Sequence, residues 1–188
     1  MANPDFQDVV RELSPSLGVY LSRMVGNPAT AEDLLQESLL KISKGLATFA
    51  GRCSLKTWAY TIATRTALDH LRRPDQRRKM VEFDESKEPR ELHEDISESI
   101  IVDEMNDCIR QVIDGLPEDY RAALILHDLE GLTAQEAADV CGTSLVTAKA
   151  RIHRGRKRLK KALESACIFY TDDDALRCDR KNPAEDCT

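Results

Sequence analysis

The thirty residues from 132 to 161, LTAQEAADVCGTSLVTAKARIHRGRKRLKK, constrain the fold more than any other part of the chain. Their pattern predicts a helix-turn-helix, in which a short helix, a tight turn at Gly142 and a longer helix follow one another. Glycine adopts the positive φ that a sharp turn requires, and two adjacent alanines let the first helix cross the second at close range. Thr143 or Ser144 can cap the second helix, because a hydroxyl oxygen there accepts a hydrogen bond from a free first-turn N–H.

The second helix of this motif is strongly basic and contains no acidic residue before position 162. Positive charges at this density, over about five helical turns, repel one another unless a polyanion lies alongside. The phosphate backbone of a nucleic acid is the natural partner, and a solvated basic helix at a domain end is the alternative. The cations are Lys149, Arg151, Arg154, Arg156, Lys157, Arg158, Lys160 and Lys161.

The formal net charge of -6 does not exclude a nucleic-acid partner. Net charge governs solubility, whereas binding depends on the local field, and acidic and basic residues are segregated along this chain. Aromatic residues make up 5% and charged residues 32% of the chain, which is typical of a helical protein with a large charged surface. A chain of 188 residues can hold one domain or two small ones.

The sequence predicts a cytoplasmic protein without membrane insertion. The N-terminus, MANPDFQDVVREL, has no basic n-region or apolar h-region, and no apolar run approaches the roughly 20 residues that span a bilayer. The six cysteines are therefore expected to be thiols, and no C-x-x-C pair indicates structural zinc. No glycine-rich phosphate loop, His-Glu metal spacing or nucleophile elbow is present, so we expect no enzyme, no cofactor and no small-molecule substrate.

Residues 1–74 are expected to form one helical domain, because apolar residues recur there at three- and four-residue steps. Pro15 is expected to break or offset the first helix. Thr30 is expected to open the second helix, with Asp33 completing a near capping box. Pro74 should end the third helix.

Three further segments follow this domain. Residues 75–100 are predicted to be a flexible acidic linker, since few apolar residues are available to offset the ordering of the backbone. A plain solvated tether is favoured over an acidic segment that occupies a basic channel meant for nucleic acid. Residues 101–166 should form a second, four-helix domain that contains the helix-turn-helix, and 167–188 a cysteine-containing tail. The predicted fold class is all-α, with two small domains.

Three segments, in this order, resemble the extracytoplasmic-function (ECF) sigma factors, the minimal group of the sigma-70 family. The family's polymerase-clamp helix is similar to NPATAEDLLQESLLKI, and its melting and minus-ten helix is similar to SLKTWAYTIATRTALDHLRR. Its minus-thirty-five module is similar to GLPEDYRAALILHDLEGLTAQEAADVCGTSLVTAKARIHRGRKRL. The resemblance covers about residues 8–163.

The resemblance implies a dissociable RNA polymerase subunit that selects promoters, melts the minus-ten element and starts transcription in a stress or environmental response. Its partners would be the clamp coiled coil and flap of core polymerase, promoter DNA and an anti-sigma factor. The alternative is a stand-alone helix-turn-helix regulator with an N-terminal sensor domain. The first half of the chain favours the sigma factor, because it contains no phosphoacceptor βα pattern and no ligand-domain strands.

Polymerase binding is assigned to Asp33, Gln36 and Glu37, whose carboxylates and amide lie on consecutive turns of one helix. Such a face suits charge-assisted docking on a partner helix rich in arginine, and a solvated face is the alternative. Minus-ten DNA contacts are assigned to cations that can meet the phosphates of a single strand. Trp58 could stack on a base, although its place among apolar positions favours a core role. These minus-ten candidates are Arg52, Lys56, Trp58, Arg65, Arg72 and Arg73.

The minus-ten helix departs from the family pattern at three positions. The family usually has asparagine where this chain has Arg65, and arginine where it has Thr61 and Thr64. The promoter preference at this element is therefore expected to differ from the family's.

Minus-thirty-five contacts are assigned along the second helix of the motif. A recognition helix reads base edges with its N-terminal half, and Lys149, His153 and Arg154 match the family's reading positions. Lysine and arginine can pair with guanine in the major groove. Thr147 could bond a phosphate near the helix start. The remaining cations suit phosphate contacts, namely Arg151, Arg156, Lys157 and Arg158.

The tail contains Cys167, Cys178 and Cys187 among acidic residues. By analogy with sigma factors that have cysteine-rich extensions, these thiols could bind a metal or sense redox state. The alternative, which their wide spacing favours, is a loose tail with one cysteine packed as a small hydrophobic residue.

Overall fold

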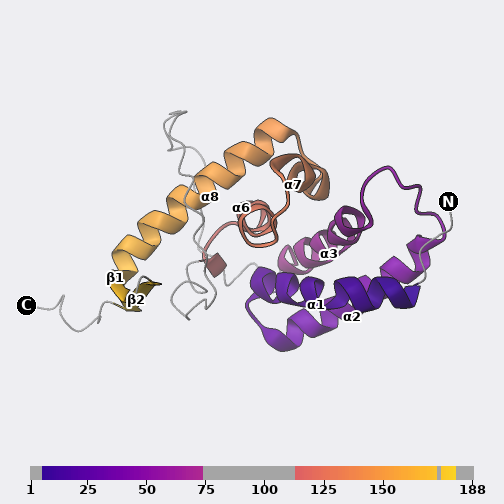
Figure 1. Cartoon of the computed structure of the whole chain (residues 1–188), viewed down its shortest axis with the longest axis horizontal. Helices are drawn as coiled ribbons and strands as arrows, with labels where there is room; N and C mark the ends of the chain where they lie inside the picture. Colours follow the sequence, from indigo (N-terminus) through magenta and orange to yellow (C-terminus); the bar gives the residue numbers. More distant parts are fainter. Residues whose placement is uncertain (1–5, 74–112, 173–174, 181–188) are drawn as a thin grey trace, which may run out of the picture.

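The computed structural model describes residues 6–73, 113–172 and 175–180. Two helical domains lie side by side, and a small hairpin stands beyond the last helix (Figure 1). The all-α fold class is confirmed for the two domains. The predicted linker and most of the helix expected to begin at residue 101 lie outside the described residues.

The N-terminal domain consists of α1 (Phe6–Val25), α2 (Pro28–Leu46) and α3 (Leu55–Leu71). The break expected at Pro15 is wrong, because α1 continues through it to Val25. Proline removes one backbone N–H, but the buried side chains of α1 lie on both sides of it, from Val9 to Met24. Packing of this apolar face outweighs the local cost of the proline.

The start of α2 also differs from the expectation. Asn27 rather than Thr30 caps the helix, and its Oδ1 accepts a hydrogen bond of 2.9 Å from the Thr30 N–H. Pro28 occupies the first helical position, where a missing N–H costs nothing. At α3, the Ser54 Oγ accepts the same kind of bond from the Thr57 N–H at 3.0 Å.

The C-terminal domain contains α6 (Glu118–Leu124), a π-helical turn η2 (Ile125–Leu129), α7 (Ala134–Cys141) and α8 (Leu145–Ala166). Helices α7 and α8 form the predicted helix-turn-helix. A reciprocal capping box between Thr133 and Glu136 starts α7, and Gly142 ends it at φ 63°. Ser144, not Thr143, caps α8, since its Oγ accepts from the Thr147 N–H at 3.1 Å.

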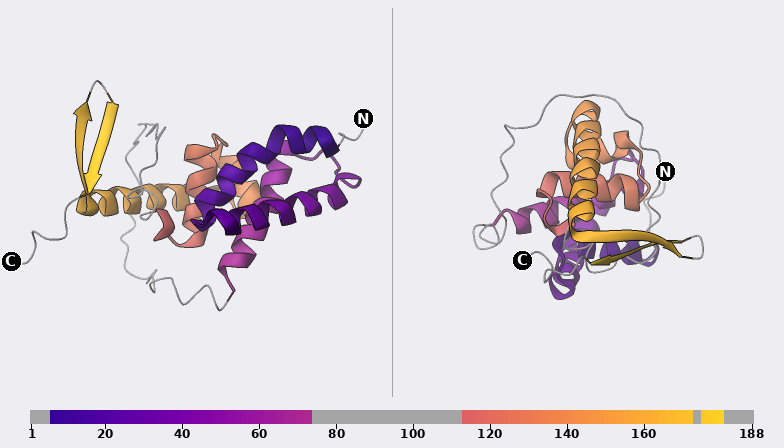
Figure 2. Two further views of the ribbon diagram at one scale, coloured as in Figure 1. Left: turned by 90° about the horizontal axis from the view of Figure 1, so that it is seen from below. Right: turned by 90° about the vertical axis from the view of Figure 1, so that its left-hand side faces the viewer.

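The two domains share one continuous core. Buried side chains of α1, α2 and α3 are in one cluster with Ile125, Leu126, Ala137 and Val140 of the C-terminal domain. Helix α3 packs against α7, and η2 packs against α1. The domains are therefore in direct contact, as the views in Figure 2 also show.

The tail forms an antiparallel hairpin of β1 (Cys167–Asp172) and β2 (Ala175–Arg180), in which Phe169 is opposite Cys178. The hairpin lies at the C-terminal end of α8, away from α1–α3 (Figures 1 and 2). These strands were not predicted from the sequence.

Candidate nucleic-acid interface

Helix α8 has a packing face and an outward face. Ala148, Ile152 and Gly155 recur at four- and three-residue steps and are buried, and α8 packs with α6 and α7. Lys149 and His153 lie on the opposite side and are exposed, as is Lys157. We call these last three residues the outward face of α8. It includes two of the three predicted base-reading residues.

The four arginines of α8 flank this face and contact their own domain. Arg151 Nη2 lies 3.0 Å from Asp119 Oδ2 of α6. Arg156 makes two hydrogen bonds to the Asp128 carboxylate, which raise the pKa of the guanidinium. The Arg158 guanidinium lies 4.7 Å from the centre of the Tyr120 ring.

The remaining two candidates of α8 are Arg154, which approaches Tyr120, and Thr147, which contacts the capping residue Ser144. Arg154 Nη1 lies 3.5 Å from the Tyr120 hydroxyl, at the outer limit of a hydrogen bond. The Thr147 side chain is half-buried, and its hydroxyl is 2.8 Å from that of Ser144. Helix α8 is thus held on α6 by Arg151 and Arg158, two cations that were predicted to contact phosphate.

The minus-ten candidates do not all come together. Three of them, Trp58, Arg65 and Arg72, follow one another at intervals of seven residues and so fall on one side of α3. Both arginines are exposed. Arg52 and Arg73 are exposed at the two ends of this helix. The structure leaves this group as the candidate surface for single-stranded DNA.

Lys56 lies apart from that surface. Its Nζ is 5.8 Å from the centre of the Tyr60 ring and donates a hydrogen bond of 3.2 Å to the Glu130 carbonyl. Tyr60 is fully buried on the side of α3 that faces the C-terminal domain. Lys56 is therefore an interdomain contact in this arrangement.

Trp58 is half-buried, and its ring centre lies 5.1 Å from that of Phe49. A Cβ built on Gly45 of α2 would come within 3.0 Å of the indole, so the two helices approach closely there. This packing supports the core interpretation of Trp58 over base stacking.

The predicted polymerase-binding residues form an exposed face on α2. Asp33, Gln36 and Glu37 are all exposed, and Glu37 is paired with Lys41 at 2.7 Å. Leu40 continues the same face one turn later and is 63% exposed. Leu40 was not among the predicted polymerase-binding residues.

Glu130 connects the domains, and its side chain is only 8% exposed. Its Oε1 lies 2.9 Å from Arg23 Nη1, and its Oε2 accepts a hydrogen bond of 2.6 Å from the Tyr60 hydroxyl. Burial, and then this bond to a carboxylate, raise the pKa of Tyr60, so the phenol remains a donor. The carboxylate satisfies a cation and a hydroxyl of the N-terminal domain at once.

Asp119 makes a second connection, between the two candidate DNA surfaces. Its Oδ1 lies 2.8 Å from Arg72 Nη2, while its Oδ2 contacts Arg151. Arg72 also lies 3.5 Å from Glu118. One acidic turn of α6 thus contacts a minus-ten candidate and a minus-thirty-five candidate together.

Arg121 is the most deeply buried of these charges, at 3% exposure. Its guanidinium donates to the carbonyls of Met24 at 2.6 Å, of Leu116 at 3.1 Å and of Asp114. Burial lowers the pKa of this group, and the nearby Asp114 opposes that shift. None of these interdomain roles was predicted.

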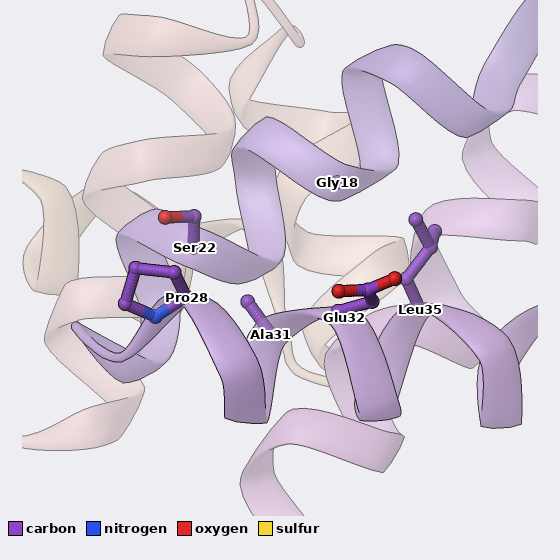
Figure 3. Close-up of a pocket in the computed structure, with 6 residues that line it drawn as sticks. All are labelled: Gly18, Ser22, Pro28, Ala31, Glu32 and Leu35. Atoms are coloured by element: carbon purple, nitrogen blue, oxygen red, sulfur yellow. The ribbon is translucent and has the colours of Figure 1, made fainter.

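A small open hollow of about 300 Å³ lies between α1 and α2 (Figure 3). The hollow exists because Gly18 and Ala31 are small residues, and Ser22 and Glu32 supply its polar atoms. One hydroxyl and one carboxylate are not the converging polar groups of a small-molecule site.

The described part of the chain contains neither a cluster of metal ligands nor an activated thiol at Cys141. No three His, Cys, Asp or Glu side chains gather there as metal ligands do. Burial raises the pKa of the Cys141 thiol to about 11, which keeps it protonated, while Cys53 is exposed. Cys187 lies outside the described residues, so the sensor hypothesis for the tail stays a prediction. Among the described helices, none has the length and hydropathy of a membrane span.

Comparisons with known proteins agree with this geometry. The family model described as Sigma-70 region 2 matches residues 9–78, and the one described as Sigma-70, region 4 matches 106–159. RNA polymerase sigma factor SigZ of Bacillus subtilis is 31% identical over 175 residues, which are 89% of this chain and 92% of that protein. ECF RNA polymerase sigma factor EcfG of Rhodopseudomonas palustris is 31% identical over 171 residues, 89% of this chain and 91% of that protein. A solved structure of the sigma factor RpoE with the anti-sigma factor NepR, from Bartonella quintana, is 25% identical, with a TM-score of 0.65 over 85% of this chain and 97% of that chain.

Proposed function

Because the chain belongs to the extracytoplasmic-function group of the sigma-70 family of RNA polymerase sigma factors, we propose that it directs core polymerase to specific promoters and melts their minus-ten element. It acts as an initiation subunit, and the polymerase supplies the catalytic site. The observation that supports this most is the separation of two exposed faces of opposite charge. The α2 face with Asp33 and Glu37 suits a basic protein partner, and the outward face of α8 suits DNA.

In vitro transcription with core polymerase on a promoter library tests the proposal. The chain should confer initiation on a subset of promoters that share an upstream and a minus-ten sequence. Tight binding of the chain alone to one specific duplex, with no effect on initiation, would favour the stand-alone regulator instead. An anti-sigma partner is part of the proposal, and the relative solved with NepR supports it.

The direct contact between the domains implies a rearrangement at the promoter. The minus-ten and minus-thirty-five elements, as their names indicate, lie about 25 base pairs apart, which is roughly 85 Å along B-form DNA. Arg72 and Arg151, which belong to the two DNA surfaces, instead meet at the single carboxylate of Asp119. We infer that the domains separate when the chain binds polymerase, and that the chain alone binds promoter DNA poorly.

Replacing Asp119 with asparagine is expected to raise the affinity of the isolated chain for promoter duplex about fivefold. The change frees Arg151 for phosphate and leaves Arg72 with Glu118 alone. Loss of this partly exposed ion pairing corresponds to about 1 kcal/mol. Fluorescence anisotropy at low salt measures the change. Asp139→Asn on α7 is the matched control, since it removes the same charge from an exposed residue whose carboxylate accepts a hydrogen bond from Gln135 on the same helix. An equal gain in both variants would mean that net charge alone opposes binding.

Two lysines on the outward face of α8 separate base reading from phosphate binding. Lys149→Ala is expected to relax sequence preference at one or two base pairs, at a cost of about 1–3 kcal/mol. Lys157→Ala, two turns later, should weaken all promoters alike and lower the salt slope by about one unit. Lys157 is a cleaner probe than Arg156, which is already bonded to Asp128. Promoter selection by each variant holoenzyme measures both effects, and a change of preference with Lys157→Ala alone contradicts the docking orientation.

A further inference from the structure

Val146 is the most exposed large hydrophobic side chain in the described part of the chain, at 78%. It lies in the first turn of α8, three residues before Lys149 and seven before His153. We propose that Val146 is a specificity residue that reads the methyl group of one thymine in the upstream promoter element. The inference rests on the proposed function and adds to it a residue and the base that it selects.

The position of Val146 follows from the two faces of α8. Residues 148, 152 and 155 are buried on the packing face. The exposed Lys149 and His153 follow Val146 by three and seven residues, so Val146 shares their side of the helix and points to the outward face. Ser144, two residues before Val146, caps the helix and fixes its first turn. A helix that enters the major groove by its N-terminal end brings this turn to the base edges first.

The chemistry of the side chain selects the base. A valine side chain cannot form hydrogen bonds, so it gains nothing from the donors and acceptors of the groove. The C5-methyl of thymine is the apolar group that base pairs present in the major groove. Valine is also stiff at χ1 in a helix, so little side-chain freedom is lost on contact. Lys149, one turn away, can pair with a neighbouring guanine, which predicts a thymine within a step or two of that guanine.

Deoxyuridine provides a direct test, because it lacks only the methyl group of thymine. The probe is the strongest promoter from the library, with each thymine of its upstream element replaced singly by deoxyuridine on either strand. Binding by wild-type holoenzyme is expected to fall about fivefold at one position and to change little elsewhere. Val146→Ala holoenzyme should bind the thymine promoter about as weakly as wild type binds the deoxyuridine one, and should be insensitive to the substitution.

Two control variants accompany this experiment. Lys149→Ala should keep the sensitivity to deoxyuridine while losing preference at the neighbouring base pair. Val19→Ala removes the same atoms from a valine on α1 that is 48% exposed, and should leave all affinities unchanged. Because alanine favours helix over valine, the Val146 variant should remain folded, which circular dichroism checks.

The outcomes separate the inference from the proposed function. If wild-type holoenzyme initiates selectively but no upstream thymine is sensitive, or if Val146→Ala keeps the sensitivity, the role of Val146 is overturned and the sigma-factor function stands. If the chain confers no promoter-dependent initiation on core polymerase, the proposed function fails and this inference fails with it.

Discussion

Replacing Asp33 and Glu37 together with lysine is expected to weaken binding of the chain to core RNA polymerase about 100-fold. The two carboxylates are exposed on consecutive turns of α2, on the face assigned to a basic partner helix. Reversal turns two attractions into repulsions, and like charges across an interface cost several kcal/mol. A loss of about 3 kcal/mol corresponds to roughly 100-fold in affinity.

Titration of the labelled chain with core polymerase measures this loss. The variant should stay folded, because the exposed pair of Glu37 with Lys41 contributes only about 0.3–0.5 kcal/mol. Lysine at both Asp8 and Glu12 of α1 is the matched control, since it reverses two exposed charges on a different helix. Unchanged affinity in the α2 variant, or the same loss in both, contradicts the assignment of this face.

Replacing Arg121 with alanine is expected to lower the free energy of unfolding by about 3 kcal/mol. The change leaves the carbonyls of Met24, Asp114 and Leu116 without this donor, and an unsatisfied buried group costs about 1–3 kcal/mol. Arg121→Met should recover part of the loss, because an apolar side chain of similar length fills the space that alanine leaves empty.

Urea denaturation followed by circular dichroism measures the Arg121 variants. Arg11→Ala is the control, because Arg11 is exposed on α1 and pairs only with its neighbour Asp8. Its effect should stay within about 0.5 kcal/mol. A loss under 1 kcal/mol for Arg121→Ala would mean that water replaces the guanidinium at these carbonyls.

Local chemistry made the helix-turn-helix predictable. The capping hydroxyl, the turn glycine and the apolar period act within a few residues of one another, so they can be read in order along the chain. The start of α2 could have been predicted in the same way, since Asn27 followed by Pro28 is a stronger N-cap signal than Thr30. The expectation at that point was wrong because it weighed the capping box over the proline.

The continuation of α1 through Pro15 depended on tertiary packing instead. A proline within a helix is a local signal to stop, and the apolar face of α1 overrides it only because α2 and α3 cover that face. The tail hairpin was missed for a different reason, because its strands lack a strong alternation of apolar and polar residues. No local rule gives the outcome of such competitions.

The sequence by itself determined the two helical domains, the recognition helix and the segregation of charge, because each depends on neighbours along the chain. Only the tertiary structure decided which charges meet. Arg23 and Glu130 are 107 positions apart, and Arg72 and Asp119 are 47 apart. Helical periodicity places each residue on a face but contains no information about the face opposite. The same cations that read as free phosphate ligands in the sequence therefore hold the two domains and α8 together. The exposure of Val146 likewise became visible only in the structure, where Ala148, Ile152 and Gly155 are buried on the opposite face of α8.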